Sequence, residues 1–278
     1  MKIYNLDKII YLPLVLIAAL ILYLGESTGN RDMTIWIFVP VVFMVITYLF
    51  SPQINFWWHK KYPIPLDPKV RQWLQGYSPY YQSLSSDDQE KYDTRLNLYI
   101  EGREFKSVGR EVRDVPEDVK GMIGSIPIMM GLHEDDFLIG DWDRVYLYKH
   151  PFPSPAYQYL HTVEVNHEDL VIIFSLEHLL PGLVRPQECY NIAIQAFAEA
   201  YIDTKKISLS DFSNYGWKEV SEVTGWKESF ITEYTGHPHL DMRAVWVTIY
   251  HTFPVALSQK YPDIYNDISA HFPNIPSL

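Results

Sequence analysis

The sequence predicts an α+β domain preceded by a hairpin of two transmembrane helices, and three observations favour this fold class. Two apolar runs without a charged residue stand close together near the N-terminus. Helical patterns then alternate with short runs rich in Val and Ile, which are typical of strands. Apolar residues make up 47% of the 278 residues and aromatic residues 15%, so the chain can bury a core and is not expected to be disordered.

The two apolar runs cover residues 9–25 (IIYLPLVLIAALILYLG) and residues 34–50 (TIWIFVPVVFMVITYLF). Each spans about 26 Å as a helix, which is near the lower limit for crossing a bilayer. A signal peptide fits the first run less well, because no small-residue cleavage site follows it. A pair of buried core helices is the other alternative. The short connection between the runs favours a membrane hairpin.

Basic residues lie on one side of both runs. Lys2 and Lys8 precede the first run, Lys60 and Lys61 follow the second, and the connecting loop contains only Arg31. Basic residues collect on the cytoplasmic side of membrane proteins. We therefore expect a multi-pass protein of the inner (cytoplasmic) membrane, in contact with the lipid bilayer, whose soluble domain faces the cytoplasm.

The rest of the chain is expected to form a membrane-proximal connector and one domain. The connector, rich in Pro, Trp and Tyr, covers residues 51–83, and the domain covers residues 84–278. Capping residues and apolar spacing predict helices over 85–102, 116–132, 186–202, 217–224, 241–252 and 254–269. Strands are predicted over 144–148 and 169–175.

Charge, cysteine content and the usual motifs exclude several functions. The chain has 34 acidic and 23 basic residues, a formal net charge of −11, which argues against nucleic acid as a partner. Cys189 is the single cysteine and excludes an internal disulfide or a Cys-rich zinc module. The phosphate-binding GxxxxGK[ST] and GxGxxG motifs, the hydrolase GxSxG motif and the zinc-protease HExxH motif are all missing.

Several short stretches nevertheless resemble a known family. Residues 96–112 read LNLYIEGREFKSVGREV, residues 114–132 read DVPEDVKGMIGSIPIMMGL, and residues 145–153 read VYLYKHPFP. The run NIAIQAFAE (191–199) comes next, and ITEY (231–234) and DMRAVWVT (241–248) follow. Their order and spacing resemble the Mlc titration factor A family of gluzincin-type zinc peptidases over residues 84–270. The resemblance implies a gluzincin-like zinc-peptidase domain.

The sequence departs from the family where the metal would bind. A gluzincin holds Zn²⁺ with two histidines one helical turn apart, and an adjacent Glu activates water. Gln195, Ala196 and Glu199 stand at those three positions. The resemblance implies a third metal ligand at Asp241 and an oxyanion-stabilising hydroxyl at Tyr234. We expect no catalytic residue and no bound metal, with Gln195 and Glu199 hydrogen-bonded to each other or to Tyr234. A Mg²⁺ or Ca²⁺ ion held by Gln195, Glu199 and Asp241 is an alternative.

These departures favour a membrane-anchored pseudopeptidase that binds a protein or peptide, or scaffolds a membrane complex, and needs no cofactor. The alternative is an active zinc-dependent peptidase, or another metallohydrolase, with a rebuilt metal site. His237, His239 and Asp241 are the candidate zinc ligands for that alternative. The family name suggests a third possibility, titration of a transcription repressor, which requires a binding surface but no catalysis.

Overall fold

The computed structural model describes residues 6–29, 31–109, 114–209 and 215–273. The chain divides into two compact units, residues 1–64 and residues 65–278. Three features of the sequence analysis lie partly or wholly outside the described residues: Lys2, the end of the stretch 96–112, and the last residues of the expected domain.

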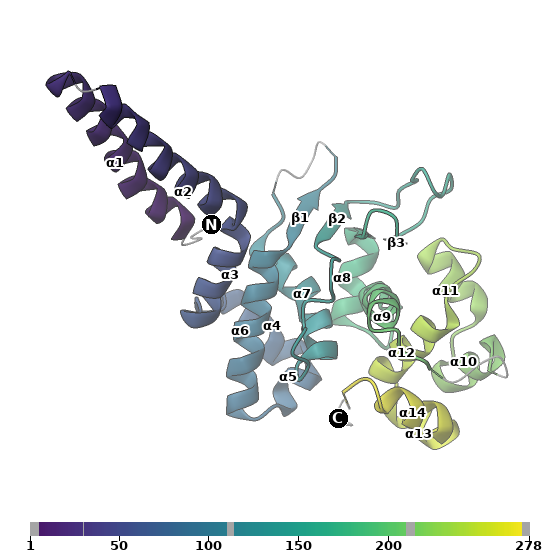
Figure 1. The fold of residues 1–278 in the computed structure, drawn as a ribbon. Coiled ribbons are helices and arrows are strands. Elements are labelled where there is room, and N and C mark those ends of the chain that lie inside the picture. The colour runs from purple at the N-terminus through teal and green to yellow at the C-terminus, as the bar shows by residue number, and fades with distance from the viewer. Residues whose placement is uncertain (1–5, 30, 110–113, 210–214, 274–278) are drawn as a thin grey trace. The chain divides into compact units, whose positions relative to one another are not determined.

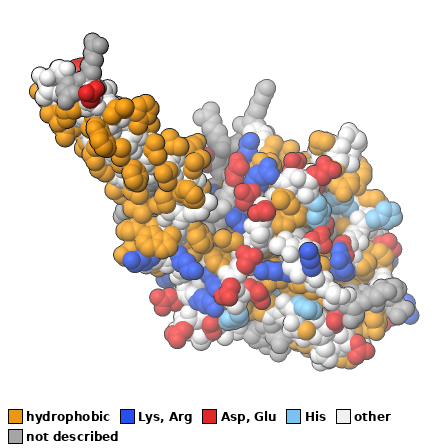
Figure 2. Space-filling view, in the orientation of Figure 1, with side chains coloured by type: hydrophobic (Ala, Val, Ile, Leu, Met, Phe, Trp, Pro, Cys, Tyr) orange, Lys and Arg blue, Asp and Glu red, His pale blue; other side chains and the backbone are white. Residues whose placement is uncertain are grey.

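The first unit is a helical hairpin. Helix α1 (Leu6–Thr28) packs against α2 (Phe38–Leu49), the 3-10 turn η1 (Arg31–Ile37) joins them, and α3 (Ser51–Lys61) follows. The segments Lys8–Thr28 and Asp32–Leu49 are long and apolar enough to cross a membrane, although a signal sequence near the N-terminus would meet the same criterion. Hydrophobic side chains cover the visible surface of this hairpin (Figure 2). The two apolar helices predicted from the sequence are therefore present.

The second unit is a mostly helical α+β structure with a small mixed sheet (Figure 1). Its first half contains α4 (Pro68–Tyr77), α5 (Pro79–Ser83), α6 (Ser86–Gly102), β1 (Glu104–Ser107), α7 (Glu117–Gly131), β2 (Arg144–Tyr148), β3 (Val163–Asn166) and β4 (Val171–Ser175). Its second half contains α8 (Leu176–Val184), α9 (Ile192–Lys205), α10 (Trp217–Thr224), α11 (Glu228–Thr235), α12 (Met242–Thr252), α13 (Pro254–Lys260) and α14 (Pro262–Ser269).

The stretch expected to be a connector, residues 51–83, is divided between the two units. Helix α3 belongs to the first unit, whereas α4 and α5 belong to the second. Val70, Leu74 and Tyr81 on these two helices are buried. Apolar and aromatic residues of α4 and α5 therefore contribute to the core of the second unit.

The sheet has the strand order β1-β2-β4-β3, in which only the β3–β4 pair is antiparallel. Val145 pairs with Ile172 and Leu147 with Phe174, so these four buried side chains lie on one face. Phe174 contacts Phe197 of α9, with the ring centroids 6.1 Å apart. This face of the sheet therefore rests on α9, and the antiparallel strand β3 forms one edge.

Helix α9 is the central helix of the second unit and is seen along its axis in Figure 1. It packs against β3 and β4 and is surrounded by α7, α8 and α12. All residues from Ile192 to Ile202 are buried except Glu199, as expected for a helix with neighbours on every side. The Asn191 side chain starts the helix by accepting hydrogen bonds from the amides of Ala193 and Ile194.

Most predicted elements of the domain are present, and two of them differ from the prediction by more than two residues or by a break. The helix predicted over 186–202 begins only at Ile192, because Asn191 caps it. The helix predicted over 254–269 is two helices, since Pro262 cannot continue the first of them. Strands β1 and β3 and helices α8 and α11 were not predicted, and each of them is short.

Candidate functional site

Helix α9 carries the three positions that the resemblance assigns to zinc chemistry. Gln195 and Glu199 are one turn apart and therefore project from the same side of the helix. Gln195 is 4% exposed, and within the described residues its Oε1 atom has no hydrogen-bond partner. Ala196 is fully buried. The helix therefore offers one buried amide and one carboxylate, and no proton acceptor at position 196.

Glu199 is paired with a histidine that the sequence analysis did not select. His167 lies in the turn between β3 and β4, and its Nε2 atom is 3.1 Å from Glu199 Oε1. Its other ring nitrogen, Nδ1, is 3.5 Å from Asp203 Oδ2 on the next turn of α9. The prediction that Glu199 hydrogen-bonds to Gln195 or Tyr234 is therefore wrong. The Glu199 carboxylate lies against the imidazole of His167 instead.

Asp241 precedes the first residue of α12 and is bound to Arg243. Its Oδ1 atom accepts a hydrogen bond from the Arg243 amide at 2.8 Å, which caps the helix. The Arg243 guanidinium donates to both carboxylate oxygens, with Nη2 2.6 Å from Oδ2. Arg243 Nη2 is also 3.6 Å from Asp203. The carboxylate that the resemblance assigns to a metal is thus held by a guanidinium and a backbone amide.

Together these five residues form an ion-pair network of three carboxylates, one guanidinium and one imidazole: His167, Glu199, Asp203, Asp241 and Arg243. Burial raises the pKa of Glu199 above its ordinary value, Asp241 and Asp203 act in the same direction, and the hydrogen bond to His167 opposes them. The hydrogen bonds to Asp241 raise the pKa of Arg243. At the position where the resemblance implies a metal, the network holds the carboxylates with the guanidinium of Arg243 and the imidazole of His167.

Tyr234 lies away from this network. Its hydroxyl donates a 2.7 Å hydrogen bond to the carbonyl of His178, and burial raises its pKa. An oxyanion-stabilising hydroxyl must be free to donate to the reacting oxygen. The structure places the hydroxyl of Tyr234 against the main chain of α8 instead, where it connects α11 with that helix.

The alternative zinc ligands, His237, His239 and Asp241, do not come together around one point. His237 and Asp241 bond to different parts of the protein. His237 Nε2 is 2.6 Å from the Val163 carbonyl, and the Tyr159 hydroxyl lies 3.2 Å from its Nδ1 atom. Burial lowers the pKa of His237. His239 is exposed to solvent, and Asp241 is held by Arg243. The structure therefore uses His237 to fasten the loop after α11 to β3.

Neither donor set fits a metal ion. No group of three or more His, Cys, Asp or Glu side chains among the described residues is arranged to hold one. The alternative of a Mg²⁺ or Ca²⁺ ion beside Glu199 does not fit either. The carboxylate of Glu199 already faces His167, and that of Asp241 already faces Arg243. A cation would have to displace these charged hydrogen bonds, each worth about 1.5–3 kcal/mol.

The network residues that the sequence analysis missed had weak signals. Asp203 follows Glu199 by one helical turn, and Arg243 follows the helix cap by two residues, so both could be placed near the site. His167 could not, because its loop is separated from Glu199 by 32 residues and the pairing depends on how β3 packs on α9.

No model of a known protein family matches the chain, and no curated protein sequence matches it.

Proposed function

We propose that this protein is a membrane-anchored pseudopeptidase related to the Mlc titration factor A family, which binds a protein or peptide without cleaving it. Its domain is proposed to face the cytoplasm from the inner membrane. One observation carries the proposal. The two carboxylates that would approach a metal, Glu199 and Asp241, are bound to His167 and Arg243, and the general base position is a buried alanine.

The arrangement of α9 and its neighbours supports the proposed relationship. Gln195 and Glu199 lie one turn apart on a helix that packs under the sheet, and α12, which starts just after Asp241, packs against the same helix. Asp241 is close enough to Glu199 to raise the pKa of the Glu199 carboxyl, although burial is the larger cause. This is the relation that a zinc helix and its third ligand require, here with other side chains.

The first unit supports a membrane anchor. Large apolar side chains along α1 and α2 are mostly exposed in this hairpin, for example Leu12 at 66% and Phe38 at 65%. An apolar surface of this extent is unfavourable in water and is stabilised by lipid. Lys60 and Lys61 at the end of α3 would then lie on the cytoplasmic side, with the domain after them.

The edge strand β3 supports peptide binding. His237 already bonds the carbonyl of Val163, at the start of the strand, whereas Val165 and Asn166 are partly exposed. The exposed backbone of an edge strand can pair with an extended peptide. The carboxyl end of β3 leads directly to His167 and the ion-pair network, so a bound peptide would lie beside this network.

Metal content separates the pseudopeptidase from the active peptidase. The full chain, purified in lipid nanodiscs after growth with added zinc, is expected to hold no stoichiometric transition metal and to cleave no member of a mixed peptide library. The physical reason is that Glu199 and Asp241 already bond to His167 and Arg243, which a metal ion would have to displace. The measurement is elemental analysis together with mass spectrometry of the library. One equivalent of zinc that disappears in Asp241→Ala would establish the active enzyme instead.

A crosslinking experiment tests the proposed peptide-binding strand. A photoreactive amino acid in place of Asn166 is expected to give one adduct of defined mass on irradiation of intact cells. The same amino acid in place of Glu90, which is exposed on α6, is the matched control and is expected to give none. Equal adducts from both positions, or none from Asn166, would contradict binding along β3.

A further inference from the structure

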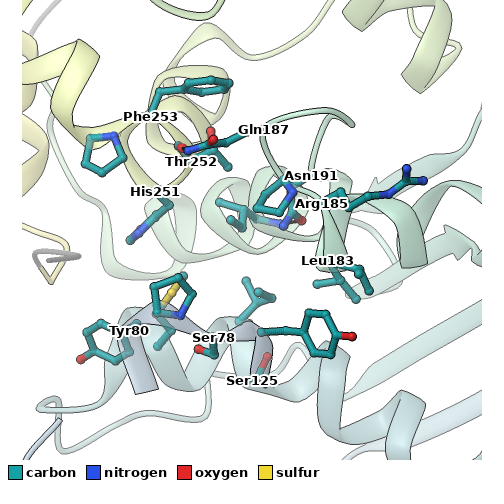
Figure 3. Close-up of a pocket in the computed structure, with 18 of the residues that line it drawn as sticks. Ser78, Tyr80, Ser125, Leu183, Arg185, Gln187, Asn191, His251, Thr252 and Phe253 are labelled. Atoms are coloured by element: carbon teal, nitrogen blue, oxygen red, sulfur yellow. Dashed lines mark hydrogen bonds between the residues drawn. The ribbon is translucent and has the colours of Figure 1, made fainter. Parts of the chain in front are cut away.

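The second unit contains a large cavity that the proposed function does not use. It has a volume of about 840 Å³ and lies between α5 and α7 on one side and α8, α12 and α13 on the other (Figure 3). Its wall is mainly apolar and aromatic and includes Trp73, Tyr80, Ile126, Met129, Leu183 and Phe253. A cavity of this size and lining falls in the range of sites that bind small molecules.

Most polar side chains in the wall already have partners. Asn191 caps α9 and donates to the Gly182 carbonyl, Ser125 donates to the Met122 carbonyl, and Thr252 donates to the Thr248 carbonyl. At the surface, Arg185 is paired with Glu188 at 3.1 Å. Among the described residues, the wall therefore offers little to a charged ligand, because Arg185 already has Glu188 as its counter-ion.

Among the described residues of the wall, two buried side chains are exceptions: Trp73, whose Nε1 has no hydrogen-bond partner, and His251, the one that can also accept a hydrogen bond. His251 is 6% exposed, and within the described part of the chain neither ring nitrogen has a hydrogen-bond partner. Figure 3 shows its ring extending from α12 into the cavity. Burial lowers the pKa of His251 to about 3, so the imidazole is neutral near pH 7 and presents one donor and one acceptor. A buried polar group without a partner is unfavourable, which points to a bound molecule that supplies one.

We propose that this cavity binds an uncharged, mainly apolar small molecule whose single hydroxyl group hydrogen-bonds to His251. The apolar wall takes the hydrocarbon part, and the neutral imidazole selects a neutral polar head. This inference rests on the cavity and on His251 alone. It therefore stands or fails independently of the absence of zinc chemistry at α9.

Photolabelling of the full chain in lipid nanodiscs tests the proposal. The probe is dodecan-1-ol with a diazirine in its chain, and labelled peptides are identified by mass spectrometry. We expect adducts on peptides that line the cavity, and we expect excess dodecan-1-ol to compete several-fold better than dodecane. Adducts on α1 and α2 report partition into the bilayer and serve as the internal reference.

Two kinds of variant make the test specific. Ala256→Trp fills the cavity from α13 and is expected to abolish the cavity adducts, and Val184→Trp fills it from the end of α8 in case the first variant misfolds. His251→Leu keeps the cavity but removes the hydrogen bond, so labelling is expected to fall about three- to tenfold. Circular dichroism confirms that each variant is folded.

Three results would overturn the proposal. The first is labelling confined to α1 and α2. The second is cavity labelling that persists unchanged in the folded tryptophan variants. The third is equal competition by dodecane and dodecan-1-ol together with unchanged labelling of His251→Leu, which would remove the hydroxyl–imidazole contact.

Discussion

The double variant Gln195→His/Glu199→His is expected to bind Zn²⁺, and to bind it about ten- to hundredfold more tightly when Arg243 is also replaced by Ala. The two imidazoles would lie one turn apart on α9, with Asp241 at the start of the neighbouring helix as the third ligand. In the double variant Asp241 must first leave Arg243. One charged hydrogen bond is worth about 1.5–3 kcal/mol. Because the Arg243–Asp241 pair is partly exposed, we take the loss of the whole pair to be of this size, which corresponds to the stated change in affinity.

Isothermal titration with zinc measures this effect, and the chain offers a matched control. Lys218 and Glu222 lie one turn apart on the exposed surface of α10, so Lys218→His/Glu222→His creates the same pair of histidines without a third ligand. The α9 variant with Arg243→Ala should bind zinc at least tenfold more tightly than this control. Equal affinity would mean that α9 does not occupy the position of a zinc helix.

Ala196 limits how closely a variant of α9 can reproduce the residues of a zinc-peptidase helix. Its side chain is fully buried, so Ala196→Glu would place a carboxylate in a closed part of the core. Burial of an unpaired charge is strongly unfavourable. The variant with all three family residues is therefore a poor test of the relationship, and metal binding by the double variant is the better one.

Acid is expected to destabilise the second unit through His251 by about 2 kcal/mol between pH 6.5 and pH 4.5. Burial lowers the pKa of His251 to about 3 in the folded protein, while in the unfolded chain it stays near 6.5. Between these values the unfolded chain binds the extra proton, so the free energy of unfolding rises with pH and is lost as the pH falls below 6.5. His251→Leu removes this contribution.

Urea unfolding of the full chain in nanodiscs at the two pH values, followed by near-ultraviolet circular dichroism, measures the difference. Carboxylates also titrate in this range, so the quantity of interest is the loss in the wild type minus the loss in His251→Leu. His133→Leu is the control, because His133 is exposed. It should lose as much stability on acidification as the wild type. If His251→Leu did the same, His251 would not be buried in the neutral form.

The network around Glu199 explains how three carboxylates can lie close together beside α9. Glu199 and Asp241 would repel each other if both were left unpaired beside Asp203. His167 from the β3–β4 turn places a ring nitrogen against Glu199. Arg243 from α12 brings a guanidinium to Asp203 and Asp241. These side chains are partly exposed, so removing one partner costs less than it would in a fully buried pair.

The sequence by itself determined the elements with strong local signals. The two charge-free runs predicted α1 and α2, because a helix of that composition needs no information from the rest of the chain. Helices α6, α7, α10 and α12 and strands β2 and β4 were predicted for a similar reason: their caps, prolines and apolar spacing lie within the element itself. The residue types at positions 195, 196 and 199 could also be read directly.

Only the tertiary structure decided what these side chains contact. His167, Glu199 and Arg243 lie on three different elements, and their pairing depends on the packing of β3 and α12 against α9. The exposure of His251 to a cavity depends likewise on helices far apart in the chain. The physical reason is that hydrogen bonds, burial and the resulting pKa shifts arise from neighbours in space, whereas a sequence pattern reports the conformation of the chain only over a few turns.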